Sequence, residues 1–161
     1  MIVERTFDYR LVREIMVDPD MWATVAEDGH DPMDYTPDVY GEGWLLLQDE
    51  DEVYGVYRVH AMNSVTCEIH AQVIPKHRKV HSRETGLLAL EWIYKNAPQY
   101  QKVVCWVPDV YPNVRKFAES FGFKLEGTNR LSYLKNGVLC DQWLLGITRN
   151  EIGELINEQH S

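Results

Sequence analysis

The sequence predicts an α/β fold: a single domain over residues 1–161, with a mixed central sheet of about six to seven strands flanked by helices. The length of 161 residues suits one domain. Three strand patterns follow one another closely at residues 44–48, 53–61 and 66–74, which is typical of an antiparallel meander. Residues 102–107 form an uninterrupted apolar run, which is typical of a strand paired in parallel and buried on both faces.

The first elements precede the meander. Residues 2–7 predict a short strand, and Asp8 is a suitable N-cap for a helix over residues 9–17. Pro19 suits the first turn of a second short helix. The Asp-, Pro- and Gly-rich residues 30–43 then predict a loop.

The third strand of the meander has two chemically different faces. Side chains alternate across a strand, so apolar and polar residues separate here. One face carries Cys67, Ile69, Ala71 and Val73, and the other carries Thr66, Glu68, His70 and Gln72. The first face is expected to join the core, and the second can line a site.

The second half of the chain alternates helices and strands. A basic loop over residues 76–83 is expected to come first, and the dipeptide Asn136-Gly137 predicts a tight hairpin turn. Gly122 is a suitable end for the helix before it. The predicted elements are a helix at 83–96, a strand at 102–107, a helix at 112–121, a strand at 123–126, a hairpin with strands at 130–134 and 138–148, and a helix at 149–158.

Charge is distributed unevenly along the chain, whose net charge is -9. From Glu14 to Tyr57 there are 13 acids and no Lys or Arg, whereas the rest of the chain has 12 acids and 16 bases. An acidic field repels nucleic acid and attracts cations, and a basic segment attracts phosphates. We therefore expect no nucleic-acid partner. No apolar run approaches the length of a membrane span, so no membrane partner is expected either.

The cysteines and histidines suggest no disulfide framework and no metal site. Three cysteines are an odd, small number, typical of reduced thiols in a cytoplasmic compartment. His77 and His81 are four residues apart, but four basic residues surround them and repel a metal cation. These basic residues are Lys76, Arg78, Lys79 and Arg83.

Several segments of the second half carry motifs of a known family. Residues 117–123 (FAESFGF) are similar to the segment LYEKLGF, and the family that this segment resembles is the GNAT superfamily of N-acetyltransferases. Residues 124–130 (KLEGTNR), with Asp141 and residues 146–149 (GITR), are similar to the branch that acetylates protein N-termini. The chain as a whole resembles the short GNAT-like proteins that tailed phages encode. The resemblance implies a sheet whose parallel strand pair splays apart at a cofactor site.

The resemblance also implies where acetyl-CoA would bind. Residues 73–78 (VIPKHR) match the start of the family pattern V-x-P-x-x-R-x-x-G-x-G. In that pattern, backbone N–H groups at a helix N-terminus hold the pyrophosphate of CoA. The implied cofactor-binding residues are Val73, Lys76, Arg78, Lys79, Val80, His81, Ser82, Arg83 and Asn113. His81 and Arg83 replace the two glycines, so their side chains are expected either to fill the place of the phosphate or to bind it.

Catalytic roles fall on three residues. An amine must lose a proton before it attacks a thioester, so a base is needed. Glu68, on the polar face of the third meander strand, is the first candidate, and His70 on the same face is the second. The family's LYEKLGF tyrosine is replaced by Ala118, so Tyr111 is the third candidate, as the acid, and Tyr133 is the alternative for this role.

The acidic first third suggests how a substrate would be recognised. In the GNAT fold, the loop after the first two helices borders the site for the amine. Asp28, Asp31, Asp34 and Tyr35 are therefore expected to bind a cationic amine: a protein N-terminus, a lysine or a polyamine. The same face can instead dock a basic protein partner.

Two functions remain open. The first is an acetyl-CoA-dependent N-acetyltransferase. The second is a catalytically inactive GNAT-fold binding or assembly protein. The second would be phage-encoded, in the virion head or against a host protein, so the expected location is the host cytoplasm or the virion.

Overall fold

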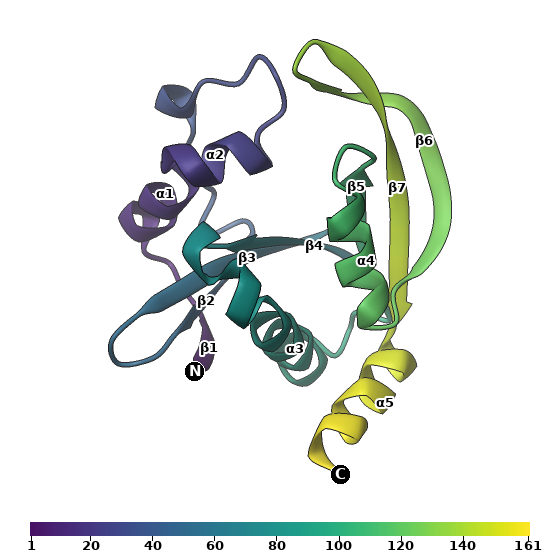
Figure 1. The fold of residues 1–161 in the computed structure, drawn as a ribbon. Coiled ribbons are helices and arrows are strands. Elements are labelled where there is room, and N and C mark those ends of the chain that lie inside the picture. The colour runs from purple at the N-terminus through teal and green to yellow at the C-terminus, as the bar shows by residue number, and fades with distance from the viewer.

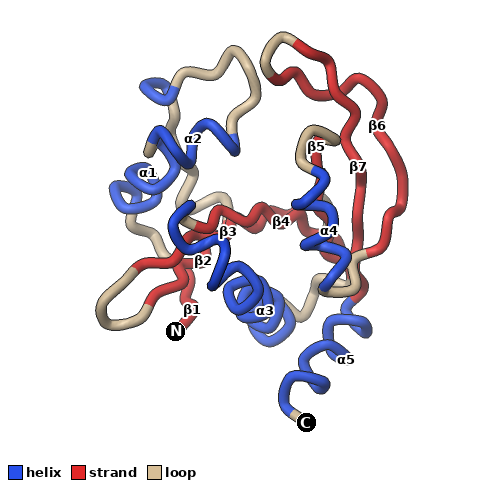
Figure 2. Tube along the Cα trace, viewed as in Figure 1, coloured by secondary structure: helices blue, strands red, loops and turns tan.

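The computed structural model describes all residues, 1–161, as one mixed sheet with helices on both faces (Figures 1 and 2). The sheet has seven strands in the order β1-β2-β3-β4-β5-β7-β6. Every neighbouring pair is antiparallel except β4 and β5, which are parallel. The strands are β1 (Ile2–Arg5), β2 (Gly43–Gln48), β3 (Val53–Ala61), β4 (Thr66–Val73), β5 (Lys102–Pro108), β6 (Lys124–Lys135) and β7 (Val138–Thr148). The predicted α/β fold and mixed sheet are confirmed.

The helices begin where the sequence supplies caps. The Asp8 side chain accepts a hydrogen bond from the Leu11 amide, and Thr148 forms a capping box with Glu151. Both therefore satisfy amides that a helix start leaves unpaired. The helices are α1 (Tyr9–Val17), α2 (Pro19–Val25), α3 (Arg78–Asn96), α4 (Pro112–Ser120) and α5 (Arg149–His160), with short 3-10 turns η1 (Pro32–Asp34) and η2 (Pro75–His77).

Two separate apolar clusters pack on the two faces of the sheet. The larger has 20 buried residues and joins the sheet to α3, α4 and α5. The smaller has eight buried residues and joins the opposite face to α1, α2 and the loop residue Val39. Apolar burial of this kind stabilises at roughly 25 cal/mol per Å². The larger cluster is therefore the main source of stability.

Two predicted boundaries are wrong. The expected basic loop 76–83 is mostly helix, because η2 turns the chain at Pro75 and α3 begins at Arg78 rather than Arg83. The strands expected at 123–126 and 130–134 are one strand, β6, with two register shifts. At the second shift Leu131 adopts a φ of 50° and its amide donates to the Asp141 carboxylate. Such a bulge lets one strand absorb residues that look like a turn.

The predicted hairpin turn is confirmed. Asn136 and Gly137 both have positive φ, 51° and 75°, which a type I′ turn requires. The turn lies beside the segment that follows α2, where the Glu27 carboxylate accepts from the Leu134 amide (Figure 1). The β6–β7 hairpin therefore contacts the segment that follows α2.

Candidate active site

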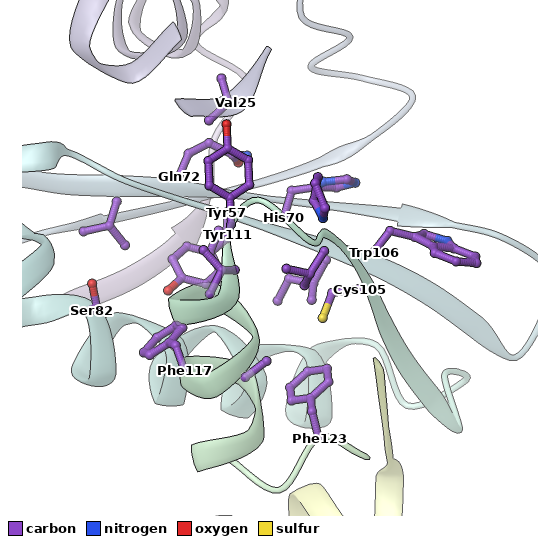
Figure 3. A pocket seen from close by; sticks show the side chains of 18 of the residues that line it. Val25, Tyr57, His70, Gln72, Ser82, Cys105, Trp106, Tyr111, Phe117 and Phe123 are labelled. Carbon is purple, nitrogen blue, oxygen red and sulfur yellow. The ribbon is translucent and has the colours of Figure 1, made fainter. Parts of the chain in front are cut away.

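The sheet opens between β4 and β5. Their pairing covers only three positions and ends at Glu68 opposite Val104. Beyond that point a cavity of about 710 Å³ opens between the strands. Side chains from β4, β5, α3 and α4 converge on it (Figure 3). The splayed strand pair implied by the sequence is therefore present.

Seven of the predicted site residues line this cavity. Glu68 and His70 come from β4, and the others come from the α3 and α4 ends of the gap. The seven residues are Glu68, His70, Val73, Arg78, Ser82, Tyr111 and Asn113. The structure thus brings the candidate base and candidate acid into one space with part of the implied cofactor site.

Glu68 is buried beside two histidines. His60 Nε2 lies 3.1 Å from its Oε2, and His70 Nε2 lies 2.9 Å from its Oε1. Burial raises the pKa of Glu68, but the contact with His70 and the nearby charges of His70, His60 and Arg58 outweigh it and hold the pKa below its ordinary value. The carboxylate is therefore ionised at neutral pH and can accept a proton.

Two tyrosines of the cavity keep their protons. Burial raises the pKa of Tyr111 and raises that of Tyr133 to about 12. Burial, together with the charge of Glu68, likewise raises the pKa of the Cys105 thiol to about 12. At neutral pH the tyrosine hydroxyls can donate hydrogen bonds, and Cys105 is a neutral thiol with no nucleophilic activation.

The N-terminus of α3 is open to an anion. No side chain caps this helix, and its first turn holds no acid. The Arg78 amide already donates to the Pro75 carbonyl, but the helix dipole favours negative charge at this end. Lys79 and Val80 are exposed there. Lys76 is 2.7 Å from Glu52, so part of its charge is already balanced within the chain.

Arg78 joins three elements. Its Nε donates to the Val73 carbonyl at 2.9 Å, and one terminal nitrogen donates to Thr24 Oγ1 at 2.9 Å. The guanidinium is therefore a link between β4, α3 and α2 as well as part of the cavity wall.

The two residues that replace the family glycines are turned out of the cavity. The lining face of α3 is the stripe Arg78, Ser82, Gly86 and Leu90, at four-residue spacing. The His81 ring instead packs on Tyr54, with ring centroids 4.6 Å apart. Arg83 lies over the Phe121 ring. Neither side chain lines the cavity.

The predicted amine-binding residues lie apart from the cavity lining. The Asp28 carboxylate accepts from the amides of Asn136 and Gly137 at 3.0 and 2.8 Å, which holds the hairpin tip in place. Asp31 accepts from the Met33 amide, and Asp34 is exposed in η1. Tyr35 packs edge-on against Trp22.

Sequence reasoning missed several residues of the site. His60 is opposite Glu68 in the β3–β4 register, a pairing that strand alternation alone does not reveal. Gln72 was placed on the polar face, yet it is buried, and its Oε1 has no hydrogen-bond partner in the cavity wall. Cys105 comes from β5, whose apolar pattern suggested only core.

Comparison with known proteins identifies the fold. No family model matches the chain, and no curated protein matches it. A spermidine N-acetyltransferase from Vibrio cholerae, solved with CoA and spermine, is 16% identical and superposes with a TM-score of 0.77 over 93% of this chain and 96% of its own. The smu.2055 protein from Streptococcus mutans UA159 is 16% identical, with a TM-score of 0.71 over 92% of this chain and 99% of its own.

The chain therefore shares the architecture of this spermidine N-acetyltransferase, an α/β domain whose sheet is interrupted between its parallel strands. More particularly, this architecture is the GNAT fold, as the sequence resemblance implied. None of the helices is long and apolar enough to cross a membrane.

Proposed function

We propose that the chain transfers an acetyl group from acetyl-CoA to a cationic primary amine, with a polyamine as the first class to test. The observation that carries the proposal is the cavity between β4 and β5. It runs from the start of α3, marked by Arg78 and Ser82, to the ionised Glu68. The structural neighbour solved with CoA and spermine supports both ligand classes.

The residues around the gap fit CoA. The uncapped α3 N-terminus and the exposed Lys79 suit a pyrophosphate, and His81 and Arg83 leave the gap open. The cavity's apolar walls suit the pantetheine arm. When bound, acetyl-CoA supplies the acetyl thioester and a thiolate leaving group. Lys79, Val80 and Ser82 would hold its phosphates, with Arg83 and Asn113 at the two sides.

Glu68 would accept the proton that the ammonium group of the substrate must lose. Its carboxylate is buried, ionised and in the cavity wall. His70, 2.9 Å away, orients it and is the second candidate for the same role. The Tyr111 or Tyr133 hydroxyl would supply a hydrogen bond, and then a proton, to the departing sulfur.

The acidic loop would act at longer range. Asp31 and Asp34 are exposed near Tyr35, so they attract a cation to the α2 side without lining the cavity. Asp28 contributes to the same field although its oxygens accept from the hairpin tip.

Binding of acetyl-CoA is the first test. Isothermal titration of the wild-type protein is expected to show binding that Lys79→Glu weakens about tenfold, because one phosphate contact becomes a repulsion. Lys116→Glu, the same charge change on an exposed position of α4, is the matched control and is expected to leave binding unchanged. Absence of binding at millimolar acetyl-CoA would overturn the proposal and favour the inactive binding or assembly protein.

The role of Glu68 is tested by Glu68→Gln. We expect kcat for acetylation of spermidine to fall by about 10²–10⁴-fold, the usual contribution of a positioned base, with acetyl-CoA binding unchanged. Thiol release measures the rate, and circular dichroism checks the fold. Unchanged kcat would exclude Glu68 as the base. It would not contradict acetyl-CoA binding, which the titration tests separately.

A further inference from the structure

Three ligand-bearing side chains meet on the polar face of β3 and β4. His60, Glu68 and His70 each direct one metal-ligating atom into a space where these atoms all lie within 4.8 Å of one another. We propose that they form a binding site for a divalent transition-metal ion of the Zn²⁺ class. This site goes beyond the proposed acetyl transfer and does not depend on it. With the ion bound, Glu68 is a ligand, so its role as the base belongs to the metal-free protein.

The backbones of β3 and β4 place the three ligands on the same face of the sheet. Glu68 and His70 are two residues apart on β4, so they share a face, and His60 is directly opposite Glu68 on β3. The two imidazole rings are nearly parallel, with an interplanar angle of 13° and centroids 5.6 Å apart. Regular sheet geometry, rather than a flexible loop, therefore fixes the spacing.

The distances between the ligand atoms are close to those around a bound ion. A tetrahedral ion with bonds of about 2.1 Å keeps its ligand atoms about 3.4 Å apart. The two observed separations from histidine nitrogen to carboxylate oxygen are 3.1 and 2.9 Å, so small outward shifts admit an ion. Moreover, the buried His70 Nε2 makes no well-aligned hydrogen bond despite its contact with Glu68. An ion would give this nitrogen a well-aligned partner.

The charge and ligand types also fit. Two imidazoles and one carboxylate are a ligand set that Zn²⁺ accepts, with a fourth position left for water. The nearby Arg58 is paired with Glu42, which balances its positive charge. Glu68 supplies the negative charge of the cluster. Because Glu68 and His70 also line the cavity, the fourth position would face it.

The test is titration of the purified, chelator-treated protein with Zn²⁺ alone. One equivalent is expected to bind with a micromolar or tighter dissociation constant. His60→Gln and His70→Gln each remove one ligand while keeping a side chain of similar size. Each is expected to weaken binding by about tenfold or more. A circular dichroism spectrum confirms that each variant is folded.

A second histidine pair provides the matched control. His77 and His81 lie near Glu52 and Glu84, so they offer Zn²⁺ histidine and carboxylate groups at a second place. His81→Gln is expected to leave binding unchanged. Absence of binding, or binding lost in His81→Gln and kept in His60→Gln, would overturn the proposal.

Co²⁺ absorption gives an independent readout of the ligands. A tetrahedral site made of imidazole and carboxylate is expected to give visible d–d bands without thiolate charge-transfer absorption. A thiolate band would place the metal on a cysteine and would also overturn the proposal. Neither outcome bears on acetyl-CoA binding, so failure here is distinct from failure of the proposed function.

Discussion

The two faces of the sheet are formed by the same strands, but the apolar core extends further over one face than over the other. On the α3 face, 20 buried residues form one apolar cluster. On the α1/α2 face the apolar cluster has eight residues, and the strands then continue with Arg58, His60, Glu68 and His70. The first face supplies most of the stability, and the second leaves part of its surface to polar groups. The candidate chemistry lies where the smaller core stops.

Two neighbouring residues of β2 test whether the larger cluster contributes more to stability than the smaller one. Leu45 packs in the larger cluster and Leu46 in the smaller one. Leu45→Ala and Leu46→Ala are each expected to lower the free energy of unfolding by about 2–5 kcal/mol, with the larger loss at Leu45. The smaller cluster contains Met16 and Met21, whose flexible side chains can refill a void. Urea denaturation measures both, and a larger loss at Leu46 would contradict the contrast.

A smaller effect is expected where the larger core meets the cavity. At Gly86 an added Cβ would lie 2.6 Å from Cζ of the buried Phe121. Overpacking costs about 1–3 kcal/mol. The better helix propensity of Ala recovers about 1 kcal/mol. Gly86→Ala is therefore expected to lower the melting temperature.

The matched control for this change is Gly153→Ala in α5. There the nearest atom is Tyr94 Oη at 3.1 Å, at the end of a half-buried side chain that can move. If Gly153→Ala lowered the melting temperature as much as Gly86→Ala, the contact with Phe121 would not be the cause of the destabilisation.

The smallest expected effect concerns the α1/α2 face, where Asp28 holds the tip of the β6–β7 hairpin. Hydrogen bonds from the Gly137 and Asn136 amides hold the pKa of Asp28 below its ordinary value. The folded-state pKa is thus below the unfolded one, so this stabilisation is present above about pH 4 and is lost as the pH falls through the folded-state pKa.

Asp28→Asn is accordingly expected to lower the free energy of unfolding slightly at neutral pH, with the difference shrinking in acid. Asp34→Asn, an exposed change nearby, is the control and is expected to have no effect. Unfolding curves at several pH values measure both. A difference between Asp28→Asn and wild type that grows in acid would reverse the sign of the argument.

Local signals were enough to predict most of the fold. The Asp8 cap and the Asn136-Gly137 turn each depend on neighbours in sequence, and both are confirmed. The alternation in β4 is confirmed only in part: Cys67, Ile69 and Val73 join the larger core, but Ala71, expected beside them, is exposed in the cavity, where the sheet opens. The start of α3 was misplaced because basic residues look like a solvated loop, whereas the turn at Pro75 begins the helix earlier. The bulge at Leu131 was missed because a hydrogen bond from a distant residue, Asp141, supports it.

The site was predictable only in part. Glu68, His70 and Tyr111 follow from strand alternation and family resemblance, and the structure brings them to one cavity. The role of His60 depends on the β3–β4 register, which is a tertiary property. The outward orientation of His81 and Arg83 depends on where α3 begins, so the misplaced helix start also hid the open gap.

The short β4–β5 pairing has a consequence for solvent exchange. At Cys67 and Glu68 the backbone of β4 pairs with strands on both sides, and from Ile69 to Val73 it pairs only with β3. Amide protons in this second stretch that point toward β5 are shielded by no ladder, although they lie in the middle of the sheet. Slowly and rapidly exchanging amides should therefore alternate along one central strand, and a ligand that fills the gap should slow the rapid ones.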